Sequence, residues 1–329
     1  RQVCEATIAG TSQLYNLALR SWSLPLLRRL GLRSDLLPEI VPTATPVAPL
    51  ASSLAREVGL GAVPVIATAG HDTAAAAAAV PYRDIERSVF ISCGTWSIIG
   101  VDTDRPMLTE GARKRHFLNE VGACGRILLA HNSTGLWPLQ ECRRAWQRAG
   151  HAWGYADLVR MAADARPWAA VVNPDAAEFY RPGDMPDKIT NWCRATGQRP
   201  PADPGAITRC LLEGLALRYR KAVEDLTMLT GRSLETVHIV GGGSRNPLLC
   251  QLAADATERQ VVAGPVEATA IGTVTLQALA HSRLSSLAEI SDLVGRSFDL
   301  TTYEPRTSAG IELAYRTFLD LESVAGKAG

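Results

Sequence analysis

Toward the C-terminal end, strands and helices alternate in the sequence, and this alternation limits the chain to few folds. Thr236 to Val240 is a short apolar run that predicts a buried strand. Gly241-Gly242-Gly243 follows as a turn, and Pro247 opens a helix because proline fits the first helical turn. A second strand, Gln260 to Ala263, leads to a helix over Ala268 to Ala280. Strands that alternate with helices in this way predict an α/β fold.

A similar transition from strand to helix lies earlier in the chain. Val65 to Ala69 predicts a buried strand, and Gly70-His71-Asp72 interrupts it. An alanine-rich helix then starts near Thr73. A hairpin of two paired strands follows, with its turn at Gly94-Thr95. These patterns predict that polar residues gather where strands end.

The rest of the chain predicts helices joined by long loops. A strand over 126–130 leads to a helix over 136–148, and a longer helix covers 206–230. The basic triplet at positions 113–115 predicts a solvated loop. Several prolines between residues 166 and 205 predict long connections without regular structure.

The chain is longer than one average domain. Its 329 residues favour two domains. The polar, proline-containing segment Pro81 to Asp84 predicts a linker. We therefore expect one domain to end within residues 1–80 and a second to occupy residues 81–329.

Composition excludes several function classes. The net charge is +1, so no broad basic surface favours nucleic acid or an anionic membrane as partner. No apolar run reaches the roughly 18 residues that a membrane span requires. Seven cysteines without a C-x-x-C pair indicate reduced thiols in the cytoplasm, although a Cys193–Cys210 disulfide stays an alternative. No cluster has the spacing of a zinc site, so no metal ligand is predicted in the chain.

Asp72 is the strongest candidate for catalysis. It follows a predicted strand, and ligands of α/β proteins gather at the carboxyl ends of strands. A carboxylate there can accept the proton of a sugar hydroxyl that attacks the γ-phosphoryl group of ATP. His71 and Thr73 flank it and can bind neighbouring hydroxyl groups. The simpler alternative is that Asp72 caps the helix that follows.

Two glycine turns are candidates for phosphate binding. The turn at Gly94-Thr95 offers backbone N–H groups and a hydroxyl donor, although an ordinary hairpin has the same pattern. The turn at Gly242-Gly243 precedes a helix and can admit a nucleotide, with Asn246 either as helix cap or as ligand contact. A dinucleotide-binding turn is a weaker alternative, because Asn246 replaces the third glycine of that fingerprint. Asn132 and Gln140 bracket a helix start, and by themselves they indicate little.

Taken together, the motifs resemble those of the FGGY family of carbohydrate kinases, in particular its members that phosphorylate L-rhamnulose. The resemblance extends over nearly the whole chain, and the joint order of the motifs is highly specific. The segments that carry it are Glu5-Ala6-Thr7, Thr11-Ser12-Gln13-Leu14-Tyr15, Gly70-His71-Asp72-Thr73-Ala74, Ser92-Cys93-Gly94-Thr95-Trp96-Ser97, Asn119-Glu120, Asn132, Gly135-Leu136-Trp137, Gln140, Pro182-Gly183-Asp184-Met185, Cys193-Arg194, Thr196-Gly197-Gln198, Val240 to Asn246 and Ala263 to Thr269.

The resemblance implies an actin-like (RNase H-like) ATPase fold with two domains, and a sugar 1-phosphate as product. ATP and Mg²⁺ are the implied cofactors, and a small sugar is the implied substrate. The sugar-binding residues it implies are His71, Asp72, Thr73 and Asn132, with Asp72 as proton acceptor. On the nucleotide side, it implies Thr95, Gln140 and the Gly242-Gly243 turn. Asn246 joins this set through the local pattern described above.

Two departures from the family pattern affect the sugar preference and the activity that we expect. Ser133-Thr134 replaces a bulky apolar pair and Val121 replaces a glycine, which favours a shifted sugar preference. The family also begins with a phosphate loop that does not precede Arg1, so the start of the first domain is expected to be absent and this chain alone to phosphorylate poorly. The alternatives are a non-catalytic nucleotide-binding remnant and a kinase for L-fuculose or D-xylulose. The oligomeric state is not predicted.

Overall fold

The chain folds into two compact units that are each assembled from separate stretches of sequence. The computed structural model describes residues 1–307 and 309–325. Unit 1 contains Arg1–Glu86, Gly100–Ala130 and Glu267–Asp299, whereas unit 2 contains Arg87–Ile99, His131–Val266 and Leu300–Gly329. Because the units are discontinuous in sequence, they do not test the domain boundary expected near residue 81, which stays a prediction.

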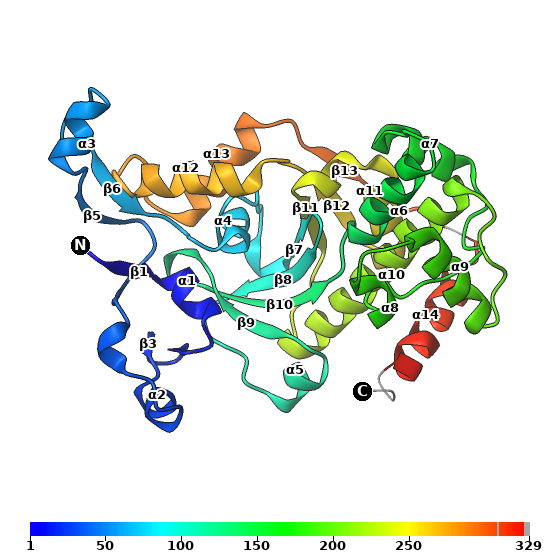
Figure 1. The fold of residues 1–329 in the computed structure, drawn as a ribbon, viewed down its shortest axis with the longest axis horizontal. Coiled ribbons are helices and arrows are strands. Elements are labelled where there is room, and N and C mark those ends of the chain that lie inside the picture. Colours follow the sequence, from blue (N-terminus) through cyan, green and yellow to red (C-terminus); the bar gives the residue numbers. More distant parts are fainter. Residues whose placement is uncertain (308, 326–329) are drawn as a thin grey trace. The chain divides into compact units, whose positions relative to one another are not determined.

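Unit 1 consists of short strands and helices (Figure 1). Its elements are β1 (Val3–Glu5), α1 (Ala6–Thr11), β2 (Tyr15–Asn16), β3 (Ser21–Trp22), α2 (Leu24–Arg29), β4 (Glu39–Val41), β5 (Thr45–Pro49), α3 (Ser52–Glu57), β6 (Pro64–Ala67), α4 (Asp72–Ala78), α5 (Glu110–Lys114), β9 (Leu118–Val121), α12 (Ala268–Ala280) and α13 (Leu287–Ser297). Strand β1 pairs in parallel with β4, and β5 pairs antiparallel with β6.

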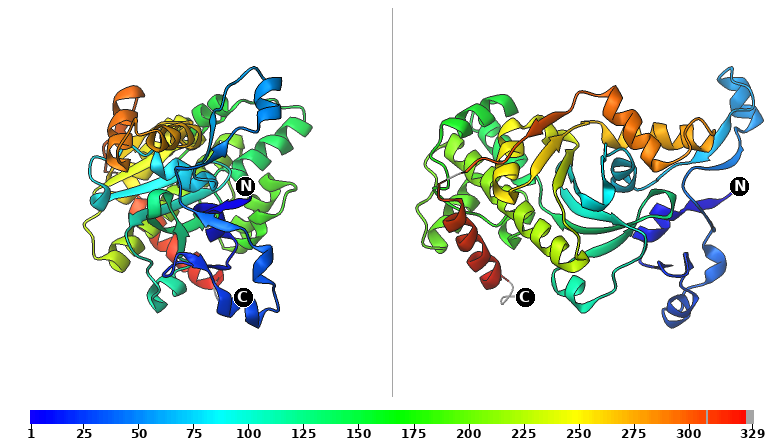
Figure 2. Two further views of the ribbon diagram at one scale, coloured as in Figure 1. Left: turned by 90° about the vertical axis from the view of Figure 1, so that its left-hand side faces the viewer. Right: turned by 180° about the vertical axis from the view of Figure 1, so that it is seen from behind.

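Helix α4 lies at the centre of unit 1. Its alanines are buried, and α12 and α13, drawn in orange, lie beside it in Figure 2. A Cβ atom on Gly272 of α12 would lie 1.9 Å from the backbone oxygen of Ala75. The two helices therefore pack backbone against backbone, which only small side chains allow. Ser291 of α13 donates a hydrogen bond to the carbonyl of Val80, just after α4, at 2.9 Å.

Unit 2 is built around a sheet. Its strands follow the order β13 (Thr301–Tyr303), β12 (Gln260–Ala263), β11 (Thr236–Val240), β7 (Ser88–Cys93), β8 (Ser97–Thr103) and β10 (Ile127–Ser133). Strand β11 runs parallel to both β12 and β7, and His238 stands opposite Val262 and Phe90. The last residues of β8, from Gly100, and the first residues of β10 belong to unit 1, where β10 pairs antiparallel with β9.

The helices of unit 2 lie mainly to the right of the sheet in the view of Figure 1. They are α6 (Trp137–Arg148), α7 (Tyr155–Asp164), α8 (Ala177–Tyr180), α9 (Met185–Ala195), α10 (Pro204–Thr230), α11 (Pro247–Thr257) and α14 (Ile311–Ala325). The longest, α10, begins at a cap in which Asp203 accepts a hydrogen bond from the Ala206 N–H at 2.8 Å, and it ends at Gly231 with φ +67°. Helix α10 packs against α7 and α11, so much of the core of unit 2 surrounds it.

The alternating pattern predicted from sequence is confirmed at β11, α11, β12 and α12. The α/β class and the hairpin turn at Gly94-Thr95 are confirmed as well. Two predictions of loop were wrong. The basic triplet at 113–115 largely belongs to α5, where Thr109 caps the helix and Glu110 pairs with Arg113. The proline-rich region contains α9, because Pro186 falls in its first turn, where a missing N–H is tolerated.

Two further observations concern the whole described chain. In residues 1–307 and 309–325, no helix combines the length and apolarity needed to cross a bilayer. All seven cysteines are free thiols, and Cys193 and Cys210 are both buried.

Candidate active site

Asp72 lies at the start of α4 in unit 1, five residues after the end of β6. Its side chain is 80% exposed, so a ligand can reach the carboxylate. One carboxylate oxygen, Oδ1, accepts a hydrogen bond from the N–H of Thr73 at 2.7 Å. The preceding residue, His71, occupies the cap position, so the prediction of Asp72 as a cap before the helix was wrong.

His71 lies between two carboxylates of unit 1. Its Nε2 atom is 3.7 Å from Oδ1 of Asp72, and its Nδ1 atom is 3.8 Å from Oε2 of Glu120. Burial raises the pKa of Glu120 above the usual range, His71 opposes that rise, and Asp72 adds to it. The three side chains form a polar group that can both donate hydrogen bonds to sugar hydroxyls and accept them. The sequence singled out Glu120 only as part of a motif and gave it no role.

Thr73 differs from its two neighbours, because it is buried in the first turn of α4. Its hydroxyl lies 3.5 Å from Oδ1 of Asp72. A contact of Thr73 with sugar stays a prediction, while its contact with the carboxylate is direct. The nearby Thr269 of α12 donates to the backbone carbonyl of Asp72 at 3.4 Å.

The turn between β7 and β8 lies in unit 2 and is held against the start of α6. The N–H of Leu136 donates to the carbonyl of Gly94 at 2.9 Å, and the N–H of Trp137 donates to the carbonyl of Thr95 at 3.1 Å. A Cβ atom on Gly135 would lie 2.6 Å from the backbone of Trp96, so this close approach requires glycine. The structure thereby fixes the backbone of a turn in which the Gly94 N–H donates to the Trp96 carbonyl at 2.8 Å and Thr95 carries a hydroxyl.

Thr95 and Gln140 were predicted to bind nucleotide, and the structure brings them together. The hydroxyl of Thr95 lies 3.3 Å from the side-chain amide of Gln140. Asn132 is exposed in β10. Its role in binding substrate stays a prediction.

The glycine turn after β11 combines one open glycine with one tightly packed glycine. Gly242 has open space at its Cβ position, whereas a Cβ atom on Gly243 would lie 2.2 Å from the sulfur of Cys93. Asn246 caps α11, because its Oδ1 atom accepts the N–H of Leu249 at 3.0 Å. Of the two alternatives for Asn246, capping is therefore confirmed.

A cavity of about 1020 Å³ in unit 2 unites several of these elements. Gly94, Gln140, Gly242 and Asn246 line it, whereas Thr95, Gly243 and Asn132 are not among its lining residues. Sequence reasoning missed the remaining walls. These include one face of α7, a strip of α11 and the segment around β13: Tyr155, Ala156, Val159, Arg160, Ala163, Leu248, Gln251, Tyr303 and Arg306. The spacing of four between residues 155, 159 and 163 was the available signal.

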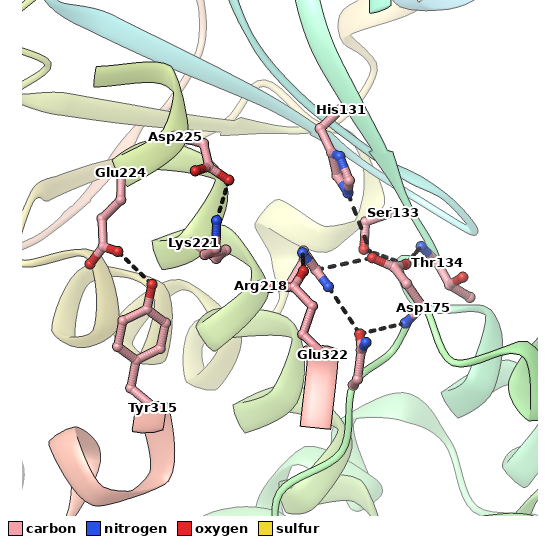
Figure 3. Close-up of polar contacts among 11 residues, drawn as sticks. His131, Ser133, Thr134, Asp175, Arg218, Lys221, Glu224, Asp225, Tyr315 and Glu322 are labelled. Carbon is pink, nitrogen blue, oxygen red and sulfur yellow. Dashed lines mark hydrogen bonds and ion pairs between the residues drawn. The ribbon is translucent and has the colours of Figure 1, made fainter. Parts of the chain in front are cut away.

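A buried ionic cluster supports the end of β10 in unit 2 (Figure 3). Asp175 accepts hydrogen bonds from the Ser133 hydroxyl at 2.9 Å and the Thr134 N–H at 2.7 Å. Its other oxygen lies 3.0 Å from Nε of Arg218 and 3.7 Å from Nε2 of His131. Burial raises the pKa of Asp175, but the interactions with His131, Arg218 and Thr134 outweigh burial and lower it overall. The cluster thus holds a charged carboxylate beside a candidate ligand-binding strand.

The geometry offers an exposed carboxylate on unit 1 and a cavity with a fixed glycine turn on unit 2. Several solved structures share this fold. Xylulose kinase from Lactobacillus acidophilus matches 99% of this chain and 64% of its own, with a TM-score of 0.73 at 16% identity. Plasmodium falciparum glycerol kinase with ADP matches 99% of this chain and 63% of its own, with a TM-score of 0.73 at 14% identity. These likenesses establish a two-domain, actin-like ATPase fold.

Models of protein families assign the chain to one family. The N-terminal domain model of the FGGY carbohydrate kinases matches residues 1–79, and the C-terminal domain model matches residues 89–281. The chain therefore belongs to the FGGY family of carbohydrate kinases. A relative from Bacteroides thetaiotaomicron named rhamnulokinase is 42% identical over 97% of this chain. The chain spans 64% of that relative's length.

Proposed function

We propose that the intact protein transfers the γ-phosphoryl group of ATP to a hydroxyl group of a ketose in the cytoplasm. The exposed carboxylate of Asp72 at the start of a buried helix is the observation that carries the proposal. L-rhamnulose, converted to L-rhamnulose 1-phosphate, is the substrate we favour. The support is the 42% identity to a relative whose name is rhamnulokinase.

In the proposed reaction Asp72 accepts the proton of the attacking sugar hydroxyl. The N–H of Thr73 donates a hydrogen bond to Oδ1 of Asp72 and so helps to hold the carboxylate in one orientation. His71 and Glu120 are placed to bind further hydroxyl groups and so to hold the sugar in one orientation. Phosphoryl transfer depends mainly on positioning and charge stabilisation, which these residues supply.

The cavity in unit 2 is the site we propose for ATP. Its volume of about 1020 Å³ is at the upper end of the range for small-molecule sites. Tyr155 and Val159 of α7 offer an apolar wall for the base. The phosphates would reach the backbone N–H and the hydroxyl of Thr95 in the turn after β7, in the manner of other anion-binding turns.

Mg²⁺ fits this arrangement as an ion that arrives with the nucleotide. Mg²⁺ commonly keeps several waters and binds through substrate phosphates and one or two carboxylates. Across the described residues there is no group of three or more His, Cys, Asp and Glu side chains that would form a dedicated cage. When bound, the ion would neutralise charge on the ATP phosphates. The residues present are compatible with that role.

A coupled ADP-release assay on the intact gene product tests the proposed function. We expect turnover with L-rhamnulose to exceed turnover with L-fuculose and D-xylulose. Calorimetric titration with ATP and Mg²⁺ runs in parallel. Binding of ATP without turnover of any ketose would overturn the proposal and favour a nucleotide-binding remnant. Turnover that favours another ketose would remove only the assignment to L-rhamnulose.

The adjacent glycines of the 241–243 turn provide a prediction for nucleotide binding. Gly242→Ala adds a methyl group where the structure has open space, so thermal stability should stay close to that of the wild type. The methyl group enters the wall of the cavity, and we expect weaker ATP binding in calorimetric titration. Gly243→Ala forces a methyl group onto buried Cys93 and should cost about 1–3 kcal/mol of stability. Unchanged ATP affinity in Gly242→Ala would mean that the nucleotide lies elsewhere.

A further inference from the structure

A buried carboxylate in unit 1 binds the backbone that leads into Asp72. Glu5, at the end of β1, is 9% exposed. Its Oε2 atom accepts hydrogen bonds from the N–H of Gly70 at 3.1 Å, the N–H of Thr7 at 2.9 Å and the hydroxyl of Thr7. Its Oε1 atom accepts a hydrogen bond from the hydroxyl of Thr43. Glu5 thus connects three segments of unit 1 through one side chain.

Thr7 extends this connection by one residue. Its hydroxyl donates to Glu5 and accepts a hydrogen bond from the N–H of His71 at 3.0 Å. The N–H groups of Gly70 and His71 are therefore both held, one by the carboxylate and one by the hydroxyl that the carboxylate orients. The two donor residues, Gly70 and His71, directly precede Asp72 in the chain.

The hydrogen bonds that the Glu5 carboxylate accepts are stronger than those between neutral groups. Backbone N–H groups that donate to a carboxylate form charge-assisted bonds, which are shorter and stronger than bonds between neutral groups. Thr7 is 1% exposed and Thr43 is 8% exposed, so water competes little for these donors. Burying a carboxylate without such donors would destabilise the fold. The hydrogen bonds therefore favour the backbone conformation in which Gly70 and His71 donate to these acceptors.

We propose that Glu5 and Thr7 are positioning residues that set the direction of the Asp72 carboxylate by fixing the backbone of Gly70 and His71. This inference rests on the proposed function, in which Asp72 is the proton acceptor. Neither residue touches the reacting atoms. They act by holding the turn from which the base projects, and small displacements of a reacting group lower rates strongly.

Thr7→Val is the variant that tests the proposal. It keeps the shape of the side chain but removes the hydroxyl that the N–H of His71 requires as acceptor. We expect kcat of the intact protein to fall by about 10- to 100-fold, with little change in KM for ATP. Thr7→Ser restores a hydroxyl and should recover most of the activity. Thr11→Val is the matched control, because Thr11 lies on the same helix and its exposed hydroxyl bonds only the Ile8 carbonyl.

A double variant distinguishes positioning from general damage. If Thr7 acts through Asp72, Thr7→Val should lower the rate in the wild-type background and have no further effect in the Asp72→Asn background. An equal effect in both backgrounds would overturn the proposal. Wild-type kcat in Thr7→Val would also overturn it, provided that Asp72→Asn itself lowers kcat. Full activity of Asp72→Asn would instead overturn the proposed function.

Hydrogen exchange supplies a readout that does not depend on activity. Glu5→Gln removes the charge of the acceptor with little change in shape, so the N–H of Gly70 should exchange faster with solvent. In Thr7→Val the N–H of His71 should exchange faster. We expect both effects in peptides that cover residues 68–73. Unchanged exchange in both variants would show that these side chains do not hold the turn.

Discussion

Replacing Asp72 by Asn is expected to lower kcat of the intact protein by about 10²- to 10⁴-fold, the range for loss of a general base. The substitution keeps the size of the side chain and an oxygen that can accept the N–H of Thr73, so α4 should still begin in the same place. The amide cannot take the proton of the sugar hydroxyl. ATP affinity should stay unchanged, because the proposed ATP site lies within unit 2 and Asp72 belongs to unit 1.

The measurement is steady-state ADP release with L-rhamnulose, together with calorimetric titration of ATP. Asp84→Asn is a suitable control, because Asp84 is an exposed aspartate of the same unit whose carboxylate binds the N–H of Glu86. That control should keep wild-type turnover. If Asp72→Asn also keeps it, Asp72 is not the base and the proposed mechanism is wrong.

Replacing Arg218 by Met is expected to lower the free energy of unfolding by about 3–5 kcal/mol, the range for removing one partner of a buried ion pair. Arg218 is 5% exposed and its guanidinium contacts Asp175, Glu322 and Asn173. Methionine fills much of the space but leaves the Asp175 carboxylate buried without its cation. Figure 3 shows that this carboxylate also binds Ser133 and Thr134 at the end of β10.

The loss should depend on pH in a defined direction. In the wild type the pKa of Asp175 is lowered below the ordinary value of 3.8. Its ionised form therefore stabilises the fold at pH above 3.8, and that contribution is lost as pH falls through the lower folded-state pKa. Without Arg218, burial should raise the pKa of Asp175. The difference between wild type and variant should be largest near neutral pH and should shrink in acid.

Urea unfolding at several pH values measures this difference. Arg218→Lys keeps the charge and loses the planar fork, so an intermediate loss is expected. Arg113→Met removes an exposed ion pair with Glu110 and should cause no measurable loss. A deficit in Arg218→Met that is the same at every pH would indicate lost packing against Phe318 in place of lost charge.

Local sequence patterns were sufficient to predict the elements whose conformation neighbouring residues determine. The strand and helix at β12 and α12, the glycine turn before α11 and the position of Asp72 after a strand all follow from short-range periodicity and turn chemistry. Helix α9 and helix α5 were missed because proline and basic residues were interpreted as loop signals. In both cases the first turn of the helix accommodates or caps those residues.

The candidate site depends more on residues that are distant in the chain. Order and spacing of motifs identified Asp72 and the glycine turns, because each is a continuous stretch of sequence. The contact between Glu5 and Gly70 joins residues 65 positions apart, and the bond between Ser133 and Asp175 spans 42 positions. Nothing in the local pattern at either end reveals its partner. Backbone preferences over a short range depend on adjacent residues, so a local pattern predicts them. Buried polar groups pair only after folding has brought distant residues together and excluded water from around them.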